Sequence, residues 1–133
     1  MLCGQVGYTW MQASAIMNCA DVSHALGRTA VANERAREAV RLSQQVGDRQ
    51  MTLYALALLA RFAVAEGRAD RAGLLWGAVE AEEGRGPVGT WDQDREEHAA
   101  PVLAHAGPEF EAARAKGRGL ALDEAVGVAL SID

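Results

Sequence analysis

The chain has 133 residues, which is enough for one folded domain but not for two independent ones. Its formal net charge of −5 argues against nonspecific nucleic-acid binding, because such binding needs a basic surface that displaces counterions from phosphates. Only 5% of the residues are aromatic, so alanine and leucine have to fill the core, and this favours packed helices over sheets.

The cysteines and the apolar runs predict the cellular location of the protein. Cys3 and Cys19 form no metal-ligand pattern, and reduced thiols are typical of a cytosolic protein. The longest apolar run, residues 53–60, is about half as long as a membrane span. We expect no signal peptide, because the first residues lack a basic segment followed by a long apolar stretch. The sequence therefore predicts a soluble, cytoplasmic protein that binds no membrane.

Glycine-containing turns divide the chain into alanine-rich segments, beginning with those at Gly27, Gly47 and Gly67. Glycine after a periodic apolar run is the usual signal for the end of a helix, because it accepts the left-handed conformation. Apolar side chains that recur at steps of three and four residues support the helices between these turns. We predict helices over residues 8–26, 30–46, 49–66, 69–83, 91–106, 108–116 and 122–130.

The fifth predicted helix carries its own signals. Thr90 and Gln93 have the spacing of a capping box, in which both side chains satisfy backbone amides at the helix start. Pro101 removes a backbone hydrogen bond, so we expect a kink there or a new helix that begins at this residue. Pro108 directly follows Gly107 and suits the first position of the sixth helix.

The chain resembles itself at a shift of 40 residues, which aligns Gly27 with Gly67 and Ala32 with Ala72. Each unit is then a helix, a short glycine turn and a second helix, with small residues where the two helices touch. This pattern predicts an all-α fold in which two stacked helical hairpins form an α-solenoid that C-terminal capping helices close. The two hairpins and the cap are expected over residues 8–46, 49–83 and 90–131 of a single domain, 1–133.

These units resemble the tetratricopeptide repeat. Its signature has a small residue seven positions before the turn glycine and an alanine five positions after it. Ala20 and Ala32 match these places in the first unit, and Ala60 and Ala72 match them in the second. Where the signature has an aromatic residue, the chain has a serine and an alanine, and its spacing exceeds the usual period of about 34 residues.

The second half resembles the last repeats of large bacterial transcription regulators of the LuxR and SARP types that contain an ATPase module. The resemblance lies in RAGLLWGAVEA (71–81), GPEFEAARAKGR (107–118) and LDEAV (122–126). It implies a C-terminal, tetratricopeptide-like region of a regulatory or signalling protein. The chain contains no GxxxxGK[ST] motif and no recognisable helix-turn-helix, so neither ATP hydrolysis nor direct DNA binding is carried over.

The candidate catalytic and metal-binding groups are better explained as structural residues. Cys19 and His24 lie about 140° apart around a helix, and Cys19 is expected in the core. Asp94, His98 and His105 lie near one helix face and could share a divalent ion, but the pattern lacks a further strong ligand. We predict no catalytic residue, no metal and no cofactor, and hence no enzyme.

Two charged groups favour ordinary solvated surfaces. The arginines between residues 28 and 49 alternate with acids, which is typical of a salt-bridged helix face. The acids between residues 80 and 97 are interpreted as solvated helix ends rather than as catalytic carboxylates.

The candidates for contacts with a partner are Trp10, Met11, Arg61, Trp76 and Trp91. Core packing is the preferred interpretation of the three tryptophans, and lining of a concave groove is the alternative. The N-terminal face has no polar cap, so we hypothesise that it pairs with a second copy or with upstream repeats of a longer protein.

The sequence thus predicts a non-catalytic module for protein–protein interaction or scaffolding, with a protein partner or a second copy in a homodimer. The alternative is a small-molecule effector-sensing module with a pocket between the hairpins and the cap. A cavity with convergent polar groups such as Asp94, His98 or Arg61 would favour this alternative.

Overall fold

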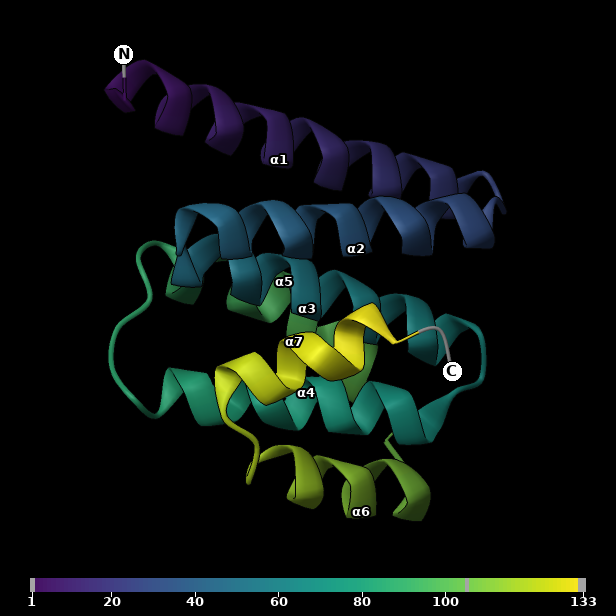
Figure 1. Cartoon of the computed structure of the whole chain (residues 1–133). Coiled ribbons are helices and arrows are strands. Elements are labelled where there is room, and N and C mark those ends of the chain that lie inside the picture. Colours follow the sequence, from purple (N-terminus) through teal and green to yellow (C-terminus); the bar gives the residue numbers. More distant parts are fainter. Residues whose placement is uncertain (1, 105, 132–133) are drawn as a thin grey trace.

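The computed structural model describes the backbone of residues 2–104 and 106–131, and the side chains of that part from residue 11 onward. Every regular element in the described residues is an α-helix, which confirms the all-α prediction (Figure 1). The helices are α1 (Leu2–Ala25), α2 (Thr29–Val46), α3 (Arg49–Ala65), α4 (Ala69–Glu83), α5 (Trp91–Leu103), α6 (Pro108–Gly117) and α7 (Leu122–Leu130).

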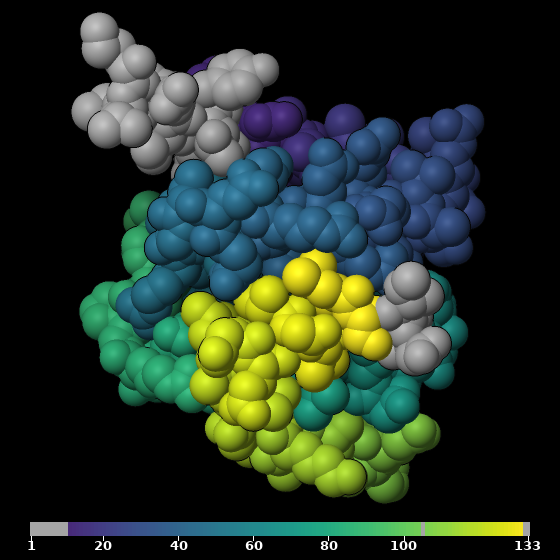
Figure 2. Space-filling view, in the orientation of Figure 1, coloured from purple at the N-terminus to yellow at the C-terminus, as the bar shows by residue number. Residues whose placement is uncertain are grey.

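The helices pack antiparallel in successive layers. The helix α1 packs on α2, α2 on α3, α3 on α4, and α6 on α4. The helix α5 packs on α3 from one side, and α7 contacts α2, α3 and α4 from the other (Figure 1). In the space-filling view, α7 covers the front of the molecule between α2 and α6 (Figure 2).

The core is centred on α3. Its side chains Leu53, Leu56, Leu59 and Phe62 are fully buried, because other helices cover α3 on several sides. This position explains why the longest apolar run of the sequence lies in α3. Trp76 and Trp91 are also fully buried, which confirms the core interpretation for these two residues.

The turns after α1 and α3 have the same geometry. Gly27 and Gly67 have φ values of 81° and 75°, in the left-handed region that side chains disfavour. The next backbone amide, from Arg28 or Arg68, donates to a carbonyl five residues earlier at 2.8 Å in both cases. This is the glycine-terminated helix end that the sequence predicted.

The structure corrects two helix boundaries. The first helix begins at Leu2 rather than at residue 8, and the fifth ends at Leu103 rather than at residue 106. No new helix begins at Pro101, which lies within α5. Because proline has no backbone N–H, residue 101 cannot donate to the carbonyl four residues earlier in the helix.

The predicted capping box at Thr90 is wrong. The Thr90 side chain makes no capping hydrogen bond, because its hydroxyl accepts one from Nε2 of Gln50 at 3.0 Å. The Thr90 amide donates in turn to Oε1 of Gln50 at 3.2 Å. Gln50 thereby ties the start of α5 to α3.

The prediction that Cys19 is buried is also wrong, since its side chain is exposed. Leu59, which occupies the corresponding position 40 residues later in α3, is fully buried. The difference arises because α1 lies at the edge of the helix stack (Figure 1), whereas α3 lies inside it.

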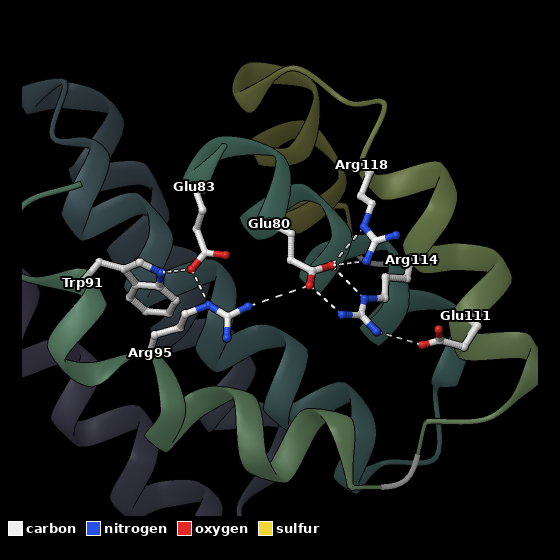
Figure 3. Close-up of polar contacts among 7 residues, drawn as sticks. All are labelled: Glu80, Glu83, Trp91, Arg95, Glu111, Arg114 and Arg118. Atoms are coloured by element: carbon white, nitrogen blue, oxygen red, sulfur yellow. Dashed lines mark hydrogen bonds and ion pairs between the residues drawn. The ribbon is translucent and has the colours of Figure 1, made fainter. Parts of the chain in front are cut away.

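A network of charged side chains joins α4 to α5 and α6 (Figure 3). Glu80 accepts from Arg114 at 2.6 and 2.7 Å and from Arg118 at 3.2 Å. Burial alone would raise the pKa of the Glu80 carboxyl, but the hydrogen bonds and charges of these two arginines hold it below its ordinary value. Glu83 accepts from Arg95 and from the Trp91 indole, both at 2.6 Å. The interpretation of the acids as solvated is therefore wrong for Glu80 and Glu83, whereas Asp92, Glu96 and Glu97 are exposed.

Three further observations complete the fold. Arg71 of α4 donates to the carbonyl oxygens of Val128 and Ala129 at 3.2 and 3.0 Å, which anchors the last turn of α7.

On α2, the ion pairs Arg35–Glu38 and Arg41–Glu34 confirm the predicted salt-bridged face. Within the described chain, no helix combines the length and the apolar character that membrane crossing requires.

Candidate binding groove

A groove of about 620 Å³ lies between α1, α3 and α5. Its volume is within the range of about 300–1,000 Å³ that is usual for ligand pockets. The lining residues combine apolar side chains with polar and charged ones. They are Ser14, Met17, Asn18 and Asp21 from α1, Gln50, Met51, Tyr54, Leu58 and Arg61 from α3, and Thr90, Asp94, Glu97 and His98 at the start of α5 and within it.

The lining residues recur at an interval of 40 residues. Three hydrogen-bonded pairs around the groove, Asp21–Arg61, Gln50–Thr90 and Tyr54–Asp94, each join residues separated by this interval. Each pair links one of the three helices to the next, so α1, α3 and α5 present corresponding faces to the groove.

Sequence reasoning identified only part of this site. Tyr54, Gln50 and Glu97 were not among the predicted contact residues, although Asp94, His98 and Arg61 had been considered. The 40-residue shift could have identified the missing residues. Gly107 lies 40 residues after Gly67 and directly precedes α6, so the same shift relates α5 to α3.

An aromatic cluster supports the α3–α5 wall of the groove. The ring of Tyr54 meets Trp91 edge to face at 5.2 Å between centroids, and Trp91 stacks on His98 at 5.5 Å. Trp91 is fully buried behind the groove, where its indole N–H donates to Glu83. Buried aromatic contacts of this kind hold the Tyr54 and His98 rings in fixed orientations.

The groove is acidic. Among its described lining residues are the carboxylates of Asp21, Asp94 and Glu97 but only one guanidinium, that of Arg61. Arg61 forms an ion pair with Asp21 at 3.2 Å. Asp94 accepts a hydrogen bond from the Tyr54 hydroxyl. Burial raises the pKa of Tyr54, and the bond to Asp94 raises it further, so the hydroxyl stays protonated and acts as a donor.

His98 is the most buried ionisable group of the groove, with 8% of its surface exposed. Burial lowers the pKa of its imidazole, and the charge of Arg61 lowers it further. The ring is therefore neutral at pH 7. Its Nδ1 atom is buried and has no hydrogen-bond partner among the described residues.

The candidate metal ligands are only partly brought together. Asp94 and His98 both line the groove, whereas His105 lies outside the described residues. In the part of the chain that the structure describes, the groove included, no group of three or more histidine, cysteine, aspartate or glutamate side chains could hold an ion. The carboxylate of Asp94 is instead engaged by Tyr54.

The predicted contact residues occupy different environments. Arg61 lines the groove, whereas Trp76 and Trp91 are fully buried and offer it no accessible surface. Met11 is exposed on α1 and is not among the lining residues, and the side chain of Trp10 lies outside the described residues.

No protein-family model, no curated protein and no solved structure matches this chain.

Proposed function

We propose that the chain is a non-catalytic binding module of the tetratricopeptide-like type, with the groove between α1, α3 and α5 as its ligand site. The observation that carries this proposal is the 40-residue interval between the residues that pair around the groove. Helical pairs that stack at a constant interval build continuous concave binding surfaces. The helices α5 and α6 continue this interval along the sequence, although they pack on α3 and α4 rather than on each other.

The ligand that fits best is a segment of a partner protein with a basic side chain next to apolar ones. Asp94 and Glu97 lie one turn apart on α5 and supply negative charge to the groove. Met17, Met51 and Leu58 supply apolar surface, and methionine adapts readily to ligands of different shape. Exposed lining residues such as Asn18 and Glu97 leave the groove open to solvent, which suits a long segment.

The resemblance to bacterial LuxR-type and SARP-type regulators supports a role in transcription regulation or signalling, with a protein as partner. Catalysis is not part of the proposal. The groove lacks an activated nucleophile among its described residues, since the raised pKa of Tyr54 keeps its hydroxyl protonated.

A second candidate, sensing of a small-molecule effector, is favoured by a specific observation. Asp94, His98 and Arg61 line one cavity of ligand size. A cavity with these convergent polar groups is the arrangement expected of an effector-sensing module. Because carboxylates outnumber the guanidinium, the effector would be a small organic cation.

Positional-scanning peptide arrays would test the leading proposal. We expect the purified chain to select peptides with lysine or arginine, and we expect the double variant Asp94→Asn/Glu97→Gln to lose at least about tenfold in affinity for them. The matched control is Asp92→Asn/Glu96→Gln, which removes the same charges from exposed positions on α5 that do not line the groove.

Three outcomes are informative. Binding that both double variants weaken equally reflects net charge alone and contradicts a groove site, and the absence of any selected peptide contradicts a peptide ligand. A thermal shift with arginine, agmatine or spermidine that only the Asp94→Asn/Glu97→Gln variant abolishes would establish the second candidate instead.

A further inference from the structure

The groove carries charges of opposite sign at different levels along its length. Gln50 of α3 hydrogen bonds to Thr90 at the start of α5. One turn further along both helices, Tyr54 donates to Asp94. The helices α3 and α5 therefore run parallel here, and Asp94 is level with Tyr54. Arg61 lies seven residues beyond Tyr54 in α3, which is about 10 Å along the groove at 1.5 Å per residue.

Glu97 strengthens the negative end of this arrangement. It lies three residues after Asp94 on α5 and lines the same groove. In the parallel register its level is about 6 Å from that of Arg61, which corresponds to four helical residues. Within the described chain, Arg61 forms its ion pair with Asp21 and with neither of the α5 carboxylates. The groove thus presents a negative centre, Asp94 with Glu97, and a positive centre, Arg61, that do not neutralise each other.

The guanidinium of Arg61 remains available to a ligand. Its side chain is 23% exposed, and among the described residues it donates one hydrogen bond, to Asp21. A guanidinium has five N–H donors, so a second carboxylate can bind beside the first. The side chain of Asp21 is 50% exposed, and ion pairs of such exposure are weak. A ligand carboxylate can therefore share Arg61 with Asp21 or replace it.

The imidazole of His98 lies between the two centres and adds no charge. The charge of Arg61 lowers the pKa of His98, whereas the charges of Glu97 and Asp94 raise it, so these groups face a common space. Burial is the largest influence on this pKa and keeps the ring neutral at pH 7. The contrast between the negative and the positive end of the groove is therefore not offset at His98.

We propose that the groove selects a partner segment in which a basic and an acidic residue lie two or three positions apart. This inference rests on the proposed peptide-binding function and specifies its ligand. An extended segment advances about 3.3 Å per residue, so two or three positions span about 7–10 Å, which matches the separation of the two centres. The basic side chain binds Asp94 and Glu97, and the acidic one binds Arg61.

Segments with charges of a single sign fit the groove less well. Two basic residues at this spacing would bring the second one against Arg61, and two acidic residues would bring one against Asp94 and Glu97. Like charges brought together across an interface oppose binding. The groove therefore discriminates against uniformly basic segments, although its net charge alone would favour them.

Fluorescence anisotropy with a series of peptides tests the spacing. Each peptide contains one lysine among apolar and uncharged residues, and a single glutamate is placed at successive positions on either side of the lysine. The gain is defined as the ratio of the dissociation constants without and with the glutamate. We expect the gain to be largest, at least about threefold, when the glutamate is two or three positions away on one side.

Two substitutions should change this gain in opposite directions. Arg61→Gln should abolish it without weakening the binding of the peptide that contains lysine alone, which also shows that the variant is folded. Asp21→Asn should increase it, because Arg61 then has no competing carboxylate from α1. Arg35→Gln, on the exposed face of α2, is the matched control and should leave the gain unchanged.

The outcomes separate this inference from the function on which it rests. If no lysine peptide binds, both are overturned. If lysine peptides bind but glutamate gives no gain at any position, the peptide-binding function stands and the selection of a paired acidic residue is overturned. A gain that persists in Arg61→Gln, or that does not increase in Asp21→Asn, places the acidic residue elsewhere and also overturns the inference.

Discussion

The guanidinium of Arg61 lies 3.2 Å from the carboxylate of Asp21, which is 40 residues earlier in the chain. This ion pair joins α3 to α1 beside the groove and neutralises one of its three carboxylates. Asp21 is half-exposed, so the pair should contribute no more than about 1 kcal/mol to stability. The charge of Arg61 also lowers the pKa of the imidazole of His98.

Replacing Arg61 should therefore be visible at His98. In Arg61→Gln we expect the pKa of His98 to rise toward its ordinary value without reaching it, since burial, the larger cause of its depression, remains. The free energy of unfolding should change by no more than about 1 kcal/mol. An NMR titration of the imidazole C–H signals measures the shift. Arg35→Gln, on the exposed face of α2, is the control and should leave His98 unchanged.

The depressed pKa of His98 also predicts how stability depends on pH. As the pH falls below about 6.5, the unfolded chain binds a proton at His98 before the folded chain does, so the folded state loses stability until its own pKa is reached. In His98→Phe, which keeps an aromatic ring against Trp91, this contribution is absent. Urea unfolding at pH 7 and pH 5.5 should show a steeper loss for the parent chain, by at most about 1 kcal/mol. Equal losses in the two chains would contradict the assignment.

Local signals allowed the turns and the large core residues to be predicted. Gly27 and Gly67 follow apolar helical patterns and end their helices in the left-handed conformation that glycine accepts. This signal is local, so it can be recognised without knowing which helices lie nearby. Trp76 was assigned to the core from its place in a helical pattern, and it is fully buried.

Contacts between distant segments could not be predicted in the same way. Tyr54 and Asp94 meet because α3 packs on α5, and no periodicity within either helix specifies that pairing. Glu80 was interpreted as solvated because the sequence does not show its partners. Arg114 of α6 and Arg118, which directly follows α6, are distant from Glu80 along the chain. Cys19 has the sequence position of a core residue, but burial also requires a covering element, and α1 lies at the edge of the stack.

The Glu80–Arg114 contact predicts a difference between two carboxylates that bind the same arginine (Figure 3). The side chain of Glu80 is 15% exposed, whereas that of Glu111 is 53% exposed. Glu80→Gln should lower the free energy of unfolding at pH 7 by about 1–3 kcal/mol, because it leaves a largely buried guanidinium with only the exposed carboxylate of Glu111 as its counterion. Glu111→Gln should change it by less than about 0.5 kcal/mol.

The same pair predicts an acid-sensitive contribution to stability. Because the folded-state pKa of Glu80 is below its ordinary value of 4.5, its contribution is complete above that pH and is lost as the pH falls through the folded-state pKa. Urea unfolding between pH 7 and pH 3 should therefore show a smaller acid destabilisation in Glu80→Gln than in the parent chain. Similar acid profiles for the two chains would show that Arg114 does not depend on Glu80.

The close approach of α4 and α6 predicts opposite effects of one substitution at two helical glycines. A Cβ atom at Gly77 of α4 would overlap the carbonyl oxygen of Arg114, whereas one at Gly127 of α7 would meet no atom within 4 Å. Gly77→Ala should lower the free energy of unfolding by about 1–3 kcal/mol, since α6 has to move away and strain the Glu80 network. Gly127→Ala should raise it by up to about 1 kcal/mol, because alanine favours the helix and nothing opposes it. Urea unfolding of both variants measures these changes, and stabilisation by Gly77→Ala would mean that α6 is held less closely against α4 than the structure shows.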